Sequence, residues 1–140
     1  MSYGAPTSAG ERRAEGRAER LLASVVGDDA FAMYADLGFL ELERDGYGYL
    51  IYPHRPVVAY DASSGELLNE YCVKFPDSGE AGPRLPDADD VLAKWMALNG
   101  DERRVLTDAN LDPPGRQLDP EHVRRDLRAA RMWRTRREAA

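Results

Sequence analysis

The side chains that could bind a metal or carry out covalent chemistry are few in this sequence. They are the two histidines, His54 and His122, and the single cysteine, Cys72. No two of them stand at the spacing of zinc ligands, and Cys72 falls inside an expected strand, where a thiol acts as a small apolar residue. The sequence also has no nucleophile elbow, phosphate-binding glycine loop or HExxH helix. We therefore expect no catalytic residue, no metal and no cofactor.

Three aspartates lie close together at the start of an expected helix: Asp87, Asp89 and Asp90. Carboxylate oxygens are the ligands that divalent cations prefer. Carboxylates also stabilise a helix N-terminus, because they accept hydrogen bonds from its free amides and meet the positive end of the helix dipole. Since capping accounts for all three residues, we interpret the group as a helix start and not as a cation site.

The tyrosines of the central stretch suggest a sheet with one polar corner. Tyr47 and Tyr49 share one side of a strand, and Tyr52 lies on the other, because side chains alternate along a strand. These rings therefore do not form one stacking platform, and we assign them to the core and rim of the sheet. The segment 52–55 leads from this strand into a connection with a proline on each side of its His-Arg pair. The Tyr52–Arg55 region is where we would look for a small polar pocket, and with it a bound ligand or enzyme chemistry.

Residues 120–140 are the basic part of an acidic chain. They carry seven arginines and three acids, a net charge of +4, which leaves −10 for the rest of a chain whose total is −6. Asp119 as cap, Pro120 at the first helical position and Glu121 in the first turn predict a helix start. At about 100° per residue, five arginines fall on one arc of roughly 140°. These arginines and a nearby tryptophan are our candidate partner-binding residues: Arg124, Arg125, Arg128, Arg131, Trp133 and Arg136.

The apolar stripe of the same helix is narrow, because it consists of Val123, Leu127 and Ala130. At about 25 cal/mol per Å² its burial yields only a few kcal/mol. That gain is close to the entropic cost of ordering the Pro-Pro-Gly segment before it. We therefore expect the helix to be docked loosely or held by a partner.

The elements that position these residues indicate an α+β fold. We predict a small four-stranded antiparallel meander with two N-terminal helices, two helices packed on the sheet and a basic C-terminal helix. Asp45-Gly46 and residues 63–65 provide the turns, since both contain residues that tolerate positive φ. The expected helices are 11–26, 30–37, 87–99, 101–110 and 120–138, and the expected strands are 39–44, 47–52, 57–60 and 67–75.

One part of this order resembles the last helix and wing of winged-helix DNA-binding domains. The similar part is helix 30–37, Gly38, strand 39–44, the Asp45-Gly46 turn and strand 47–52. The resemblance implies DNA binding. Two helices precede the wing instead of three, however, and helix 30–37 carries no basic residue to meet phosphates.

Length and composition set the outer limits. One hundred and forty residues fit a single domain. One cysteine, no apolar run of membrane-spanning length and a start unlike a signal peptide predict a cytoplasmic protein that does not enter a membrane. We divide the chain into a disordered tail (1–9), a single α+β domain (10–112), a Pro/Gly linker (113–119) and a basic C-terminal helix (120–140).

We predict a non-enzymatic interaction module that binds a protein partner through its terminal helices. One alternative is a DNA-binding protein with a degenerate winged helix, in which the C-terminal helix would contact nucleic acid. A second alternative is a small enzyme or ligand binder that uses the Tyr52–Arg55 region. The first predicts exposed apolar side chains on the first or last helix, the second a contiguous positive surface, and the third a concave pocket containing His54.

Overall fold

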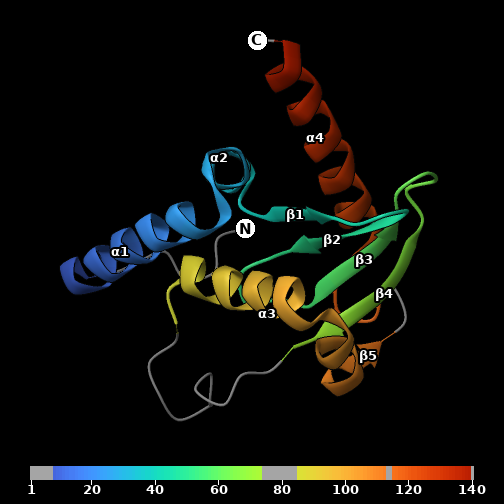
Figure 1. Ribbon diagram of the computed structural model, residues 1–140, viewed down its shortest axis with the longest axis horizontal. Coiled ribbons are helices and arrows are strands. Elements are labelled where there is room, and N and C mark those ends of the chain that lie inside the picture. The colour runs from blue at the N-terminus through green and yellow to red at the C-terminus, as the bar shows by residue number, and fades with distance from the viewer. Residues whose placement is uncertain (1–7, 74–84, 113–114, 140) are drawn as a thin grey trace.

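The chain folds into helices on both faces of an antiparallel sheet with the strand order β1-β2-β3-β4-β5 (Figure 1). The structure is a computed structural model and describes residues 8–73, 85–112 and 115–139. The α+β class and the four-stranded meander are confirmed. Within the described ranges the elements are α1 (Ala9–Val26), α2 (Asp28–Leu37), β1 (Leu40–Glu43), β2 (Tyr47–Ile51), β3 (Val57–Asp61), β4 (Leu67–Cys72), α3 (Asp87–Asp108), β5 (Asn110–Asp112) and α4 (Pro120–Ala139).

The short strand β5 was not predicted from the sequence. It pairs antiparallel with the end of β4 and places Leu111 opposite Tyr71. Three residues are too few to show the alternation by which a strand is recognised. The predicted end of the preceding strand at residues 74–75 lies outside the described residues.

Both predicted turns are present. At the first, Gly46 has a φ of 84°, and the Arg44 amide donates to the Tyr47 carbonyl at 2.8 Å, so Asp45-Gly46 is the two-residue loop of a hairpin. At the second, the Asp61 carboxylate accepts hydrogen bonds from the amides and hydroxyls of Ser64 and Ser63. These bonds favour the ionised form and lower the pKa of Asp61 to about 2.

The first helix begins earlier than expected. Ser8 caps α1 by accepting the Glu11 amide at 3.0 Å, so Ala9 belongs to the helix and not to a tail. Residues 1–7 lie outside the described residues. Gly38 ends α2 in the left-handed conformation, with a φ of 85°, and the next residues enter the sheet.

The helix α3 contains the predicted corner between two helices. Asp101 has non-helical angles, and its carboxylate accepts the Arg104 amide at 3.3 Å, which caps the second part. Val91 and Leu98 are buried on the side that faces the sheet, whereas Trp95 is only partly buried at the edge of the same cluster.

Asp87, Asp89 and Asp90 lie in the first turn of α3, so the group marks a helix start as interpreted, but the side-chain cap that we expected from these aspartates is supplied by another helix. The carboxylate of Glu15, on α1, accepts the amides of Asp87 and Ala88 at 2.9 and 3.2 Å. Burial raises the pKa of Glu15, and these two bonds oppose the increase. The cap therefore comes from a distant helix, which no local pattern around residue 87 could show.

Two apolar cores lie on opposite faces of the sheet. The first face is covered by α1 and α3, and it includes Leu40, Leu42 and Ile51 from the strands. The second face includes Leu50, Tyr52, Val58 and Tyr60, and it is covered by α4 together with Met33 of α2. Strand β2 is thus buried on both faces, as its apolar sequence predicts.

The apolar stripe of α4 is docked against the second core. Val123, Leu127 and Ala130 are all buried there. The approach to the helix is also fixed, because the buried Glu70 carboxylate accepts the amides of Arg116, Gln117 and Leu118. We predicted a linker at 113–119 and a separate helix at 120–140, and this division into folding units stays a prediction. In the structure, α4 packs on the sheet.

None of the helices in the described ranges combines the length and the apolar character that crossing a bilayer requires.

Candidate functional site

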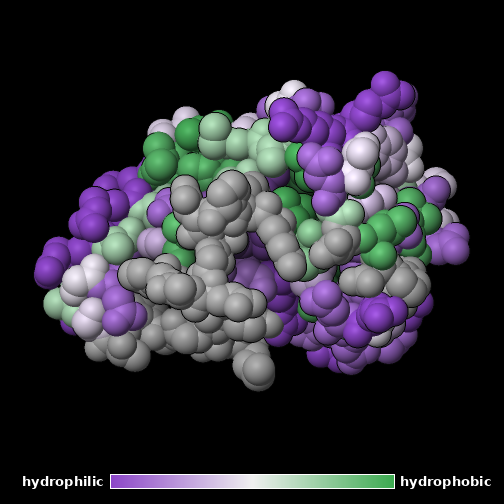
Figure 2. Space-filling view, turned by 90° about the horizontal axis from the view of Figure 1, so that it is seen from below, coloured by the Kyte–Doolittle hydropathy of each residue, from purple (hydrophilic) through white to green (hydrophobic). Residues whose placement is uncertain are grey.

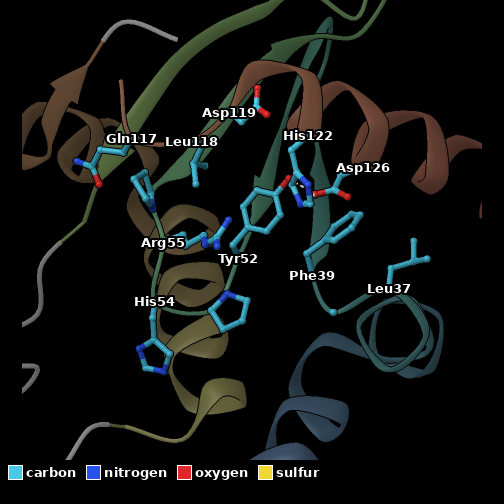
Figure 3. Close-up of a pocket in the computed structure, with 13 residues that line it drawn as sticks. Leu37, Phe39, Tyr52, His54, Arg55, Gln117, Leu118, Asp119, His122 and Asp126 are labelled. Atoms are coloured by element: carbon cyan, nitrogen blue, oxygen red, sulfur yellow. Dashed lines mark hydrogen bonds and ion pairs between the residues drawn. The ribbon is translucent and has the colours of Figure 1, made fainter. Parts of the chain in front are cut away.

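A pocket lies where the Tyr52–Arg55 region meets the start of α4 (Figure 3). Its volume is about 750 Å³, within the usual range for small-molecule sites. One wall is the β2–β3 connection, another is the first turns of α4, and the residues between α2 and β1 close a third side. The lining consists of Leu37, Gly38, Phe39, Tyr52, Pro53, His54, Arg55, Pro56, Gln117, Leu118, Asp119, His122 and Asp126.

Three polar side chains converge at one end of this pocket. The Tyr52 hydroxyl donates to Asp126 Oδ2 at 2.8 Å, and His122 Nε2 lies 3.3 Å from the same oxygen. Figure 3 shows the three groups pointing toward one another. Burial and the neighbouring Asp126 carboxylate raise the pKa of Tyr52, so its hydroxyl remains a donor at neutral pH.

A buried ion pair from α3 shapes the connection that carries Arg55. Lys94 Nζ lies 2.6 Å from Asp90 Oδ2 and donates to the carbonyls of Tyr52 and Arg55 at 2.9 and 2.8 Å. The Asp90 carboxylate also accepts a hydrogen bond from the backbone amide of His54 at 2.7 Å. His54 itself has a positive φ of 59°. Because a non-glycine residue resists positive φ, these bonds are needed to hold the connection in this form.

The side chain of His54 turns away from the centre of the pocket. Its Nε2 atom lies 3.0 Å from Asp87 Oδ1, at the start of α3. Figure 3 shows the ring directed away from Tyr52 and His122. The pocket thus contains His54 in its wall, as the ligand-binding alternative predicts, but the histidine that faces Asp126 is His122.

The polar end of the pocket has the groups for ligand binding and proton exchange. A carboxylate that orients an imidazole, as Asp126 does for His122, is the arrangement found in general acid–base catalysis. Among the residues that line the pocket, however, there is no Ser, Thr, Cys or Lys to serve as a nucleophile. Within the described part of the chain, no three His, Cys, Asp or Glu side chains gather as a metal site, and Cys72 ends β4 as a free thiol.

The second candidate site is the outer face of α4. The five predicted arginines, Arg124, Arg125, Arg128, Arg131 and Arg136, are all exposed on it. Met132 lies among them with 58% of its surface exposed. We call these five arginines and Met132 the α4 face.

Trp133 and two further arginines point in the other direction. The Trp133 indole donates to Asp36 of α2 at 2.7 Å, so it contacts the body of the protein. Arg134 pairs with Glu41 and Glu43 of β1, both at 2.8 Å, and Arg137 pairs with Asp29 at 3.0 Å. These contacts fix the rotation of α4 and thereby hold the α4 face outward. They were not predicted, because their partners are distant in sequence.

Two polar contacts at or beside the pocket were not predicted although each carries a local signal in the sequence. His122 and Asp126 stand four residues apart, the spacing at which helical side chains meet. Asp90 and Lys94 have the same spacing, and they lie beside the apolar stripe that includes Val91. A charged pair on the buried side of a helix indicates a polar cluster inside the protein.

No family model, curated protein or solved structure matches this chain at a significant level.

Proposed function

We propose that this protein is a non-enzymatic interaction module that binds an acidic protein partner through its terminal helices, with the α4 face as the main contact. The observation that carries the proposal is the exposed Met132 among arginines. Arg128 and Arg136 lie four residues before and after it, and Arg125 seven before, so all three are its neighbours on the helix surface. Methionine and arginine are both enriched in protein interfaces.

The first helix supports the same proposal with a similar combination. Leu21 and Val25 of α1 are 51% and 39% exposed, and Arg17 lies one turn before Leu21. Figure 2 shows apolar and strongly hydrophilic side chains next to one another at the end of the molecule formed by α1. The interaction-module hypothesis predicts exposed apolar side chains of this kind on the terminal helices.

A protein partner is favoured over nucleic acid by the negative charge of most of the chain and by the position of α2. The chain outside residues 120–140 carries −10, which repels a polyanion such as DNA. Helix α2, the counterpart of a recognition helix, is partly covered by α4 and pairs its Asp29 and Asp36 with that helix. We place the protein in the cytoplasm, in keeping with its single free cysteine.

The test compares an acidic amphipathic peptide with a short duplex DNA as fluorescent probes at about 50 and 500 mM salt. We expect the peptide to bind more tightly than the DNA, and the affinity to fall with salt. The variant Arg125→Glu/Arg128→Glu should weaken peptide binding by about 100-fold, and Met132→Ser by about tenfold.

The matched control is Arg103→Glu/Arg104→Glu, which changes charge equally on an exposed part of α3. An equal loss in the control would show general charge attraction and contradict the proposal. Tighter binding of the duplex would favour the DNA-binding alternative and also overturn the protein-partner proposal.

A further inference from the structure

A second group of exposed arginines lies on the first half of α1, which is drawn in blue and lies far from α4 (Figure 1). An open hollow of about 470 Å³ is lined there by residues of α1 alone. Its lining consists of two small residues, Ala9 and Gly16, and four exposed arginines. We call these arginines the α1 arginine cluster: Arg12, Arg13, Arg17 and Arg20.

The charges of α1 are separated by sign. At about 100° per residue the four arginines fall within an arc of roughly 140°. The three glutamates of the helix, Glu11, Glu15 and Glu19, fall outside that arc. Glu15 is also engaged elsewhere, because its carboxylate caps α3. Within the described residues, no side chain of the α1 arginine cluster forms an ion pair or a hydrogen bond, so its guanidinium groups are available to a ligand.

This grouping lowers the stability of the helix that carries it. Arg13 and Arg17 stand four residues apart, and Arg17 and Arg20 three, and like charges at these spacings repel one another on a helix surface. Gly16 weakens the same turn, because glycine is a poor helix former. A Cβ at Gly16 would lie 3.6 Å from Arg20 Nη1, so this guanidinium lies over the bare backbone. Local features that cost stability without a gain inside the fold are expected where a ligand binds.

The lining of the hollow favours a compact anion over a protein segment. The α4 face has the exposed Met132 among its arginines, whereas the hollow on α1 has only Ala9 and Gly16 between the guanidinium groups. Without an apolar anchor, binding depends on charge and hydrogen bonds. A guanidinium donates paired hydrogen bonds to a phosphate group, and the cluster spans about 12 Å along the helix axis. This length suits a short ligand in which several phosphate charges are close together.

The acidic body of the protein does not exclude such a ligand as it does a nucleic acid. A duplex extends beyond the four arginines and meets the surplus of negative charge on the rest of the chain. A small anion contacts only the α1 arginine cluster, and exposed charges more than about 8 Å away are largely screened at physiological salt. The ligand that fits is therefore short and densely charged.

We propose that the α1 arginine cluster binds a small soluble ligand with two or more linked phosphate groups, which lies over Gly16 and accepts hydrogen bonds from Arg13, Arg17 and Arg20. This function goes beyond the partner binding proposed above and does not depend on it. Because the ligand removes the repulsion among the arginines, its binding stabilises the first half of α1.

The test uses tripolyphosphate as the probe, with orthophosphate and citrate as comparisons, and measures affinity by NMR titration of the full chain in magnesium-free buffer. We expect tripolyphosphate to bind about tenfold more tightly than either comparison, with shifts at the amides of residues 12–20. Arg13→Gln/Arg17→Gln should weaken tripolyphosphate about 20-fold. The matched control is Arg103→Gln/Arg104→Gln on an exposed part of α3, and its affinity should stay within about twofold.

Gly16→Gln tests the hollow itself. Glutamine is a better helix former than glycine, so this variant should unfold at the same temperature as the unmodified protein or above it. Its side chain covers the floor of the hollow and should weaken tripolyphosphate about fivefold. Unchanged affinity in Gly16→Gln would show that the ligand does not lie over Gly16 and would contradict the proposal.

Other results would also overturn the proposal. Citrate that binds as tightly as tripolyphosphate would show that linked phosphates are not recognised. An equal loss in Arg125→Gln/Arg128→Gln and in Arg13→Gln/Arg17→Gln would show general attraction to exposed arginines. Binding to vesicles of phosphatidylcholine and a phosphoinositide, without binding of free tripolyphosphate, would indicate a lipid surface instead of a soluble ligand. If a cluster variant fails to fold, the titration of the unmodified protein decides, and shifts confined to the α4 face would contradict a site on α1.

Discussion

Gly48 in the middle of β2 lies opposite Tyr60 of β3, and the phenol ring of Tyr60 covers its Cα. A Cβ at this position would overlap the ring. Tyr60 has little freedom to move, because its hydroxyl donates to the buried carboxylate of Glu41, which also pairs with Arg134. We therefore predict that Gly48→Ala lowers the free energy of unfolding by about 1–3 kcal/mol, as overpacking does. Urea denaturation measures the loss.

Gly100 provides the control for this substitution. A Cβ there would meet no atom within 4 Å, and its φ is not positive. Gly100→Ala should leave stability unchanged or raise it, since glycine weakens a helix by roughly 1 kcal/mol relative to alanine. A loss in Gly100→Ala as large as in Gly48→Ala would show that the Tyr60 ring is not the cause.

At the scale of residues, the sequence predicts contacts that depend on near neighbours. The Asp45-Gly46 turn and the Asp119 cap were predicted correctly, because turn and cap chemistry is local. The cap that Glu15 supplies to α3 was not predicted, because its two ends are more than 70 positions apart. Nor could the sequence show that Glu41, on the polar side of β1, is buried against Arg134.

At the scale of elements, Glu70 connects β4 to the approach of α4. Its side chain is buried, and its two oxygens accept three successive backbone amides, of which those of Arg116 and Leu118 lie at 2.9 and 3.0 Å. Glu70→Gln replaces one of these acceptors by an amide donor, so at least one buried N–H loses its partner. We predict a loss of about 1–3 kcal/mol. Hydrogen exchange should become faster in α4 than in β1–β3.

The matched variant is Glu66→Gln, an exposed glutamate immediately before β4 and four residues before Glu70. It should change stability by less than about 0.5 kcal/mol, as surface substitutions usually do. If hydrogen exchange in the Glu70→Gln variant increases equally in α4 and in the sheet, the carboxylate supports the whole fold and not specifically the position of α4.

The sequence predicted the elements better than their arrangement. Leu40 and Leu42 alternate with glutamates in the expected strand 39–44, and Val91 and Leu98 recur at helical spacing in the expected helix 87–99. All four are buried, as such periodic signals indicate. The stripe of α4 was also identified correctly, but its docking site was not. That site is the second face of the sheet, which includes Tyr52 and Tyr60.

At the scale of the whole molecule, the arginines behind the charge asymmetry divide into two groups. Arg134 and Arg137 pair with acids of β1 and α2, so part of the +4 of the C-terminal segment is balanced inside the molecule. The arginines of the α4 face are exposed, and of these Arg131 donates to the Ala62 carbonyl at 3.3 Å and Arg124 pairs with Glu121 of the same helix at 2.6 Å. Most contacts of α4 with the body thus come from one side of the helix, while Arg125, Arg128 and Arg136 present charge on the other, and variants at these positions can separate the two sides.

Deletion of residues 119–140 tests whether the preceding part is a folding unit of its own, as the predicted boundary at 113–119 implies. The structure leads us to expect that it is not. Without α4, the apolar side chains of Leu50, Val58 and Tyr52 would be exposed to water, although all three are buried in the full chain. At about 25 cal/mol per Å², exposing this face removes a large share of a typical stability of about 5–15 kcal/mol.

We expect the truncated chain to lose cooperative thermal unfolding, or to unfold more than about 10 °C below the full chain. Near-ultraviolet circular dichroism should show the loss of fixed packing around the tyrosines. The control is Arg125→Glu/Arg128→Glu, which reverses two charges on the α4 face but keeps the buried stripe of Val123 and Leu127. This variant should unfold within a few degrees of the unmodified protein. Unchanged, cooperative unfolding of the truncated chain would contradict this prediction and would show that residues 10–112 fold independently, with α4 as a separable arm.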